Sequence, residues 1–224
     1  MARVARVVAE GYPHHITQRG NNRQVVFNDD EDRKEYLSLI KSHSKKYNLD
    51  ILAYCLMKNH IHFIAVPNAP DSLAKTFNFA HMRYSQYYNK RNGMCGHLWQ
   101  GRFYSCAMDE RGVYACARYI ENNPVRANVA HEVCAYEWSS ARVHCGIDKK
   151  DEFGVNRLFD YIDGSCESWK KFIQEKESRG EMERIKTHTM KGLPIGEEGF
   201  IKKLENKLGR VLKVAPRGRP KKNK

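Results

Sequence analysis

The sequence predicts an α+β protein: a ferredoxin-like antiparallel sheet with helices packed on one face, plus a helical C-terminal extension. Two observations support this prediction. Segments with the two-residue alternation of strands and segments with the period of helices follow one another in the order β-α-β-β-α-β-α. The chain has 224 residues, of which 41% are hydrophobic and 29% charged. It is therefore long and apolar enough to bury a core.

The first strand and the first helix are expected near the N-terminus. Residues 12–18 are typical of a strand, and the polar cluster 19–22 is typical of the turn that closes it. Residues 28–30 carry the capping and acidic side chains that favour a helix start. Apolar and aromatic residues then recur on the expected helix at Tyr36, Leu37, Leu39, Ile40 and Tyr47.

A hairpin and a second helix follow. Residues 50–57 and 60–66 are apolar segments joined by the two residues 58–59, which is the length of a tight hairpin connection. The prolines within 67–70 interrupt the pattern, and a helix is expected from residue 72 to about 89. Its apolar positions are Leu73, Phe77, Ala80, Tyr84 and Tyr88.

The last elements of the expected core are a strand over 98–108 and a helix that starts at Asp109. The helix has apolar residues at i, i+3, i+4 and i+7, and Pro124 is expected to stop it because the residue before a proline avoids the α conformation. The apolar positions are Val113, Cys116, Ala117 and Ile120.

Composition divides the chain into three expected units. Residues 1–145 form the main domain, 146–207 a helical extension and 208–224 a basic tail. The extension contains a polar stretch over 175–191. A final short helix is expected with Phe200, Leu204 and Leu208 four residues apart. The tail holds seven Lys and Arg and no acidic residue, which is typical of a polyanion-binding arm.

Charge and targeting signals restrict the function class. Lys and Arg exceed Asp and Glu by 39 − 26 = 13, which favours nucleic acid as the partner. The sequence lacks a secretion signal and any long apolar run, so we expect a cytoplasmic protein that does not contact the membrane. The seven cysteines are odd in number and form no Cys-x-x-Cys pair, which indicates reduced thiols.

Two pairs of residues have spacings that suit chemistry. Side chains alternate along a strand, so His60 and His62 point to the same face and could share one metal ion. Tyr119 and Asn123 are four residues apart on the last core helix and are therefore neighbours. A phenol is a poor nucleophile at neutral pH unless a cation or a base favours the phenolate. A nearby metal would meet that need.

Several separated motifs resemble one known family. They are Met57-Lys-Asn-His-Ile-His-Phe63, residues 97–105, Tyr119-Ile-Glu-Asn-Asn-Pro-Val-Arg-Ala127, the opening 13–20, and the ending 192–196 with 218–220. Together they resemble the single-tyrosine transposases of the HUH superfamily, and most closely the REP-associated tyrosine transposases. The order of the motifs also fits, and the resemblance spans nearly the whole chain.

The resemblance implies a specific activity. It makes Tyr119 the nucleophile, His60 and His62 the histidine pair, and Asn123 the third metal ligand. The implied reaction cleaves and rejoins single-stranded DNA at hairpin-forming repeats through a 5′-phosphotyrosine intermediate, with Mg²⁺ or Mn²⁺ as cofactor. The protein would act as a monomer or a homodimer.

Two other functions stay open. Tyr84 and Tyr88 have the Tyr-x-x-x-Tyr spacing of rolling-circle replication initiators, although an aromatic stripe that packs a helix onto the sheet is the favoured explanation because Leu73 and Phe77 continue it. A non-catalytic, regulatory DNA-binding protein could keep the same fold. An intact set of His60, His62, Tyr119 and Asn123 argues against such a protein.

Candidate DNA contacts lie in three places. Trp99, Arg102 and Phe103 mix aromatic rings with a cation, which suits base stacking along a charged groove or, alternatively, a core strand. A polar loop that could contact phosphates or bases follows the first strand. Near the C-terminus, a Pro-Arg-Gly-Arg-Pro segment resembles an AT-hook or serves as a non-specific basic arm. The candidate residues in the loop and the tail are Arg19, Asn21, Asn22, Arg23, Arg217 and Arg219.

Overall fold

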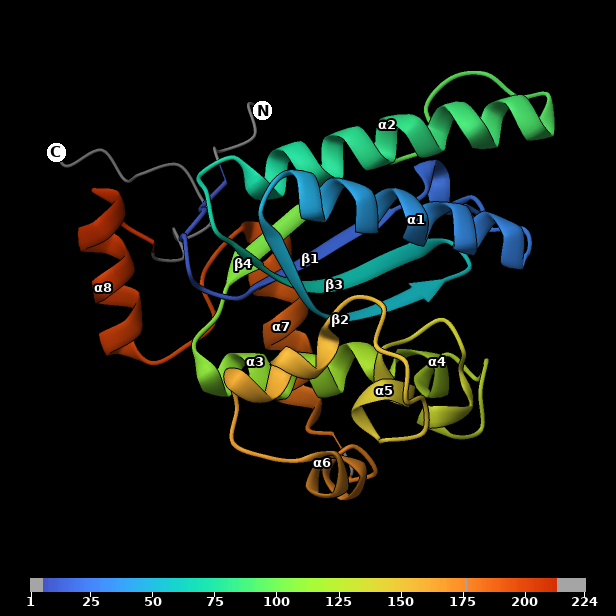
Figure 1. Cartoon of the computed structure of the whole chain (residues 1–224). Helices are drawn as coiled ribbons and strands as arrows, with labels where there is room; N and C mark the ends of the chain where they lie inside the picture. The colour runs from blue at the N-terminus through green and yellow to red at the C-terminus, as the bar shows by residue number, and fades with distance from the viewer. Residues whose placement is uncertain (1–5, 176, 213–224) are drawn as a thin grey trace, which may run out of the picture.

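A computed structural model describes residues 6–175 and 177–212 (Figure 1). Its described strands form one antiparallel sheet in the order β2-β3-β1-β4. The chain enters them in the order β-α-β-β-α-β, and the sheet order is that of a ferredoxin-like fold, so the predicted fold class is confirmed. The strands are β1 (His14–Arg19), β2 (Leu49–Met57), β3 (His60–Pro67) and β4 (Tyr104–Ala107).

Two long helices cover one face of the sheet. They are α1 (Asp30–Lys46) and α2 (Ser72–Asn92), which lie side by side above the strands in Figure 1. The carboxylate of Asp29 caps α1 by accepting a hydrogen bond from the backbone N–H of Asp32 at 3.1 Å. Both helices bury aromatic and aliphatic side chains against the sheet, at positions that the helical period predicts.

Helices also cover the opposite face, so the expectation of helices on one face is wrong. That second layer contains α3 (Glu110–Glu121) and α7 (Arg179–Lys191), and α7 contacts both β1 and β4. Figure 1 shows α3 and α7 on the side of the sheet away from α1 and α2. The polar composition of 175–191 hid this helix, because only Ile185 and Thr189 of α7 are buried.

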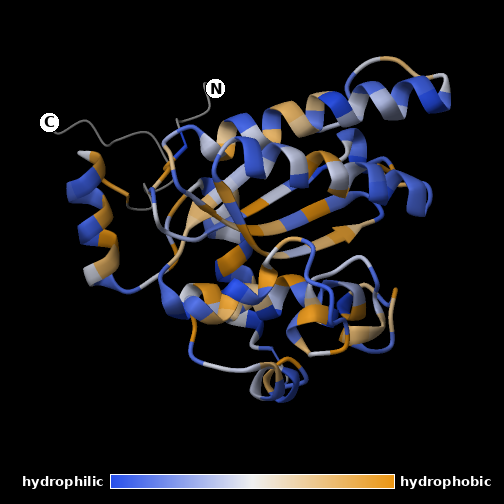
Figure 2. Cartoon of the chain, viewed as in Figure 1, coloured by the Kyte–Doolittle hydropathy of each residue, from blue (hydrophilic) through white to orange (hydrophobic). Residues whose placement is uncertain are grey.

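Side-chain alternation along β3 separates the two layers. Ile61, Phe63 and Ala65 belong to the cluster under α1 and α2, while Ile64 belongs to the cluster under α3. Figure 2 shows polar and apolar residues alternating along the strands. Because successive side chains of a strand point to opposite faces, His60 and His62 lie on the α3 face.

Strand β4 is shorter than the predicted 98–108. Residues before Tyr104 bend back over the end of β1, where the Gln100 N–H donates to the Arg19 carbonyl at 2.9 Å. Gly101 has φ of 73°, a left-handed conformation that glycine tolerates and a strand does not contain. The bend therefore replaces the first half of the expected strand.

The predicted helix stop near Pro124 is close to the observed one. Helix α3 ends at Glu121, and a further turn, α4 (Asn123–Arg126), starts immediately afterwards with Pro124 in its first turn. Proline suits that position because it has no N–H to donate. Tyr119 and Asn123 therefore lie on two consecutive helical segments instead of one continuous helix.

The remaining described elements surround the sheet. The main-chain segment around Ser139 covers the outer edge of β2, since Leu56 N–H donates to the Trp138 carbonyl and Ser140 N–H to the Tyr54 carbonyl. Helix α8 confirms the predicted final helix. These elements are η1 (Asn21–Arg23), η2 (Val133–Ala135), α5 (Ala141–His144), η3 (Val155–Asp160), α6 (Cys166–Phe172) and α8 (Glu198–Leu208).

Apolar side chains from both sides of residue 145 share one cluster under α3, including Ala141, Trp169 and Ile185. All seven cysteines are free thiols. Within 6–175 and 177–212, no helix combines the length and the apolar character that crossing a membrane would need.

A buried carboxylate holds the C-terminal end of α3. Glu121 accepts hydrogen bonds from His144 Nδ1 at 2.6 Å, from Trp169 Nε1 at 2.9 Å and from the Ser140 hydroxyl. His144 Nε2 lies 2.9 Å from the Val155 carbonyl oxygen. Burial by itself lowers the pKa of His144, but the charge and hydrogen bond of Glu121 raise it above the usual value. Glu121 thus joins α3 to α5 and α6.

We expect Glu121→Gln to destabilise the protein by about 3 kcal/mol, because breaking a buried ion pair leaves its partner uncompensated. Urea unfolding followed by circular dichroism would measure this change. Glu167→Gln is the matched control, since the Glu167 side chain on α6 is 83% exposed and its pair with Lys171 contributes little. Equal unfolding free energies for the two variants would contradict the role of Glu121.

Buried His81 should make the stability depend on pH. Its ring centre lies 4.6 Å from that of Trp99, and its Nε2 lies 2.9 Å from the Tyr36 hydroxyl. Burial lowers the pKa of His81 to about 3. As the pH falls, His81 takes up a proton in the unfolded chain before it does so in the folded protein. The contribution of neutral His81 to the free energy of unfolding is therefore complete above about pH 6.5 and is lost as the pH falls toward 3.

This group alone adds a slope of up to about 1.4 kcal/mol per pH unit below pH 6.5. We expect His81→Gln to remove that part of the slope when unfolding free energies are measured from pH 4.5 to 7. His131→Gln, at an exposed position, is the control. Identical pH profiles for wild type and His81→Gln would contradict this prediction, because they would mean that the pKa of His81 is the same in the folded and unfolded states.

Candidate functional site

A pocket of about 350 Å³ lies on the α3 face, between β1, β3 and α7. The neighbouring strands β1 and β3 place histidine side chains in it, because alternate side chains of both strands point to this face. Helices α3 and α4 place Tyr119 and Asn123 in it from the other side. The side chains that line it are His15, Thr17, Gln18, Arg19, His60, His62, Gln100, Tyr104, Tyr119, Asn123, Lys186, Thr189 and Met190.

His60 has a defined hydrogen-bond arrangement. Its Nδ1 lies 2.7 Å from Asn59 Oδ1, and Asn59 Nδ2 donates to the Arg23 carbonyl at 3.3 Å, which fixes the orientation of the Asn59 amide. Because Asn59 Oδ1 can only accept, Nδ1 of His60 carries the proton. The lone pair of His60 is therefore on Nε2, which lies 3.1 Å from the amide nitrogen of Asn123.

His62 is deeper in the same pocket. Its ring centre lies 5.1 Å from that of His60, and its Nδ1 lies 2.9 Å from Nε2 of His15. Burial lowers the pKa of His60 to about 4 and, with the charge of His60 close by, lowers the pKa of His62 well below the usual value. Both imidazoles are therefore neutral at pH 7, the form in which histidine binds metals.

Tyr119 faces the two deeper histidines. Its ring centre lies 5.7 Å from that of His62 and 6.2 Å from that of His15, edge-on in both cases. Burial raises the pKa of the Tyr119 phenol, while the charge of Arg126 acts in the opposite direction. The phenol is thus protonated at neutral pH and needs help to ionise.

Arg126 supports Tyr119 from α4. Its guanidinium carbon lies 4.4 Å from the centre of the Tyr119 ring, and Nη2 donates to the Tyr119 carbonyl at 2.6 Å. Nη1 pairs with Glu177 at 2.5 Å. This double contact orients the cation over the ring, where it can stabilise negative charge on the phenol.

The pocket thus contains all four residues that the sequence motifs select: His60, His62, Tyr119 and Asn123. Within the described part of the chain, no three His, Cys, Asp or Glu side chains are arranged to hold a metal by themselves. Two neutral imidazoles and an amide nevertheless fit a divalent cation. The Nε2 lone pair of His60 lies beside the Asn123 side chain, and rotating the amide by 180° brings its oxygen there.

The polar loop after β1 lies at the edge of this pocket. Arg19 lines the pocket and is exposed, and Asn22 and Arg23 are exposed with positive φ of 48° and 61°. Asn21 is half-buried and lines a neighbouring hollow that also includes Gln100. Of the four loop candidates, Arg19 therefore lies at the site, and Asn21 lies at the neighbouring hollow.

The base-stacking prediction for Trp99 and Phe103 is wrong for this structure. Trp99 is 7% exposed and packs against His81 and Tyr36, while Phe103 is 3% exposed and packs against Phe77. Their rings fill the core under α2, but from the bend before β4 and not from the core strand that the alternative interpretation predicted. Arg102 between them is exposed. Arg217 and Arg219 lie outside the described residues.

The rival tyrosines lie on the other face of the sheet. Tyr84 and Tyr88 are buried on α2, and their hydroxyls donate to the carbonyls of Val26 and Val25. Both rings belong to the apolar core under α1 and α2, as the packing interpretation of their spacing predicted, and their hydroxyls tie α2 to the chain segment before α1. Neither lines the histidine pocket.

Sequence reasoning missed several residues at the site, among them His15, Arg126, Lys186 and Thr189. His15 and Thr17 are two residues apart on β1, so their side chains point to the same face of the sheet, and both line the pocket. The two-residue period of the first strand could therefore have placed His15 on the face of the histidine pair. Lys186 and Thr189 come from α7, whose packing against β1 has no local signature in the sequence.

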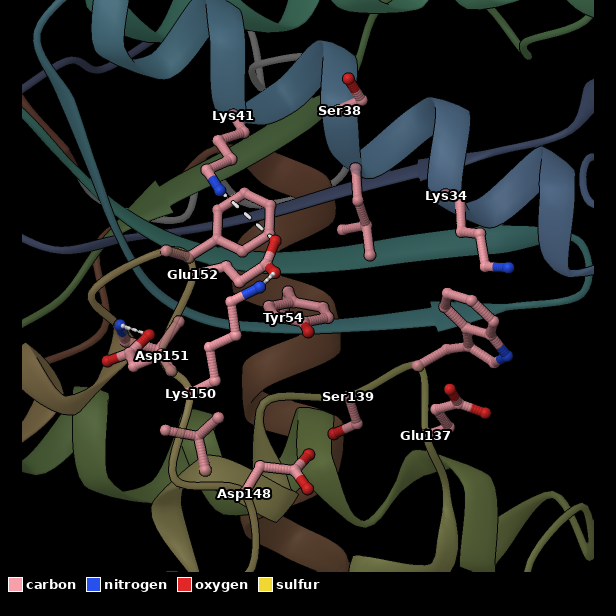
Figure 3. Close-up of a pocket in the computed structure, with 15 residues that line it drawn as sticks. Lys34, Ser38, Lys41, Tyr54, Glu137, Ser139, Asp148, Lys150, Asp151 and Glu152 are labelled. Carbon is pink, nitrogen blue, oxygen red and sulfur yellow. Dashed lines mark hydrogen bonds and ion pairs between the residues drawn. The ribbon is translucent and has the colours of Figure 1, made fainter.

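A second hollow, of about 490 Å³, lies between α1 and residues 137–155 (Figure 3). It contains none of the four motif residues. Glu152 pairs with Lys41 at 3.3 Å and with Lys150 at 2.5 Å, so both lysines already have a carboxylate partner. The histidine pocket is therefore the stronger candidate for catalysis.

A ferredoxin-like sheet with a histidine pair facing a helical tyrosine places the chain in the class that its motifs resemble, the single-tyrosine transposases. Residues 9–123, just over half of the chain, match the family of IS200-like transposases, and the chain belongs to that family. No curated protein matches the sequence.

The solved structures that are similar to the chain include two transposases. One is a REP-associated tyrosine transposase bound to a REP hairpin, with 18% identity and a TM-score of 0.54, covering 68% of this chain and 90% of that one. This likeness supports the fold. The other is described as a transposase of Deinococcus radiodurans, with 20% identity and a TM-score of 0.37, covering 55% of this chain and 97% of that one. A score that low carries no argument.

Proposed function

We propose that this transposase cleaves and rejoins single-stranded DNA through a covalent bond between Tyr119 and a 5′ phosphate. The observation that carries the proposal is the convergence of the Tyr119 ring on the neutral histidine pair in one pocket. A DNA-binding protein without catalysis would not need this arrangement.

In the proposed reaction the phenolic oxygen of Tyr119 attacks a backbone phosphorus. The new O–P bond forms as the bond from phosphorus to the 3′ oxygen breaks, and the leaving oxygen ends as a 3′-hydroxyl. The phenol loses its proton, and Arg126 over the ring favours the resulting charge. Rejoining reverses these changes when a DNA 3′-hydroxyl attacks the phosphotyrosine.

We propose His60, His62 and Asn123 as the residues that hold a divalent cation, Mg²⁺ or Mn²⁺. When bound, the cation would polarise the scissile phosphate and favour the phenolate. The protein keeps both imidazoles neutral by burial, so their lone pairs are available without loss of a proton. Imidazole ligands suit Mn²⁺, whereas Mg²⁺ prefers oxygen.

The proposed substrate is a single strand next to a DNA hairpin. The formal charge of +13 favours a polyanion, and Arg19 is an exposed cation that lines the pocket. The similar solved transposase is bound to a REP hairpin, which supports hairpin-forming repeats as the substrate. We propose that the protein acts as a monomer or a homodimer.

We expect Tyr119→Phe to abolish the covalent protein–DNA product, because the variant keeps the ring and loses the attacking oxygen. A labelled hairpin oligonucleotide with a single-stranded flank, incubated with Mg²⁺ or Mn²⁺ and analysed by denaturing electrophoresis, would detect the adduct. Tyr104→Phe, at another pocket tyrosine, is the matched control and should still form it. An adduct formed by the Tyr119→Phe variant would transfer the role of nucleophile to another residue.

We expect chelation to stop cleavage and Mg²⁺ or Mn²⁺ to restore it. His62→Ala should lower the cleavage rate at least about 100-fold, since loss of a ligand removes several kcal/mol of transition-state stabilisation. His97→Ala, at an exposed histidine away from the pocket, should not. Full cleavage by the chelated protein would refute the metal assignment.

A further inference from the structure

Helix α7 contributes a buried hydroxyl next to the histidine pocket. The Thr189 side chain is 1% exposed, and its oxygen lies 2.7 Å from Nδ1 of His15. His15 in turn places Nε2 at 2.9 Å from Nδ1 of His62. The three side chains form a continuous hydrogen-bonded row that ends at the proposed metal ligand. The role of this row rests on the proposed function of that site.

The direction of this row depends on where Thr189 donates. Its hydroxyl lies 2.8 Å from the carbonyl oxygen of Ile185, one turn earlier in α7, and a carbonyl can only accept. The Thr189 oxygen is then an acceptor for the other contacts, namely His15 Nδ1 and the Cys106 thiol at 3.2 Å. His15 therefore carries its proton on Nδ1 and offers the lone pair of Nε2.

His62 continues the row in the same direction. It must place its proton on Nδ1 to donate to the lone pair on Nε2 of His15. Its own lone pair is then on Nε2, the nitrogen that remains for a ligand in the pocket. If the row ran in the opposite direction, the proton of His62 would be on Nε2 and would block metal binding.

We propose that Thr189 and His15 are positioning residues that set the tautomer of His62 for metal binding. Hydrogen bonds to the second ring nitrogen commonly orient metal-binding histidines in this way. Here the last acceptor is a backbone carbonyl of α7, a helix that lies beyond the residues matched by the family. A residue in the C-terminal part of the chain thus sets the tautomer of His62, a proposed metal ligand on the central sheet.

The row also explains why a helix with two buried residues packs against β1. Ile185 and Thr189 are the buried residues of α7, and they are four residues apart on the side that faces the sheet. Ile185 joins the apolar cluster under α3. Thr189 forms the hydrogen bond with His15 on β1.

The first test reads the tautomer without metal or DNA. In protein labelled with ¹⁵N in the imidazoles, long-range ¹H–¹⁵N spectra at pH 7.5 should show His62 protonated on Nδ1, with His62→Gln identifying the signal. Thr189→Val removes the acceptor, so we expect the His62 proton to move wholly or partly to Nε2. Thr189→Ser should restore the wild-type pattern, because serine keeps the hydroxyl.

The second test measures Mn²⁺ affinity by calorimetry on the whole chain. We expect Thr189→Val to weaken binding about 10-fold to 100-fold, the usual effect of losing such a partner. Thr187→Val is the matched control, because Thr187 is exposed on the same helix and the substitution is identical. Thr189→Ser and Thr187→Val should bind as wild type does.

Two results would overturn the proposal. One is a wild-type His62 protonated on Nε2, a measurement that no folding defect of a variant can affect. The other is a Thr189→Val variant with unchanged tautomer and Mn²⁺ affinity. Failure of the proposed function is distinguishable, because it would appear as adduct formation by Tyr119→Phe while the tautomer pattern stayed as expected.

Discussion

The two-residue alternation of side chains along β1 and β3 is the constraint on which the rest of the structure depends. On β3 it sends Ile61 and Phe63 into the core under α1 and α2, and turns His60 and His62 toward α3. On β1 it sends Ile16 to the core and His15 to the pocket. A one-residue slip in register would exchange these faces, so the apolar core also fixes the site.

Burial then determines the chemistry of the polar side chains on the α3 face. Desolvation keeps the histidines neutral and raises the pKa of Tyr119. The pocket is therefore suited to bind a cation, and a cation is what the tyrosine needs in order to ionise. The charge of Arg126 over the Tyr119 ring acts in the same direction. Burial in the same pocket thus has two effects: it keeps the histidines able to bind a cation, and it makes Tyr119 need that cation.

The helix that carries Tyr119 is held by charged groups at its C-terminal end. Glu121 binds the segments after α4 through three donors, and Arg126 returns from α4 to the Tyr119 carbonyl and ring. These contacts use residues close to the tyrosine in sequence, Glu121 at the end of α3 and Arg126 on α4. The C-terminal region packs against this end of α3 and, through α7, against β1. It is therefore part of the structure around the pocket.

The sequence by itself determined the order of the elements, the hairpin between β2 and β3 and the motif residues, because these depend on local period and turn chemistry. Contacts between residues that are far apart in the sequence decided the remaining features of the fold and the site. The buried positions of Trp99 and Phe103, the short β4 and the second helical layer follow from how the chain closes over β1. The contact of Thr189 with His15 joins residues 174 positions apart. No local pattern encodes it, since only the folded sheet brings α7 beside β1.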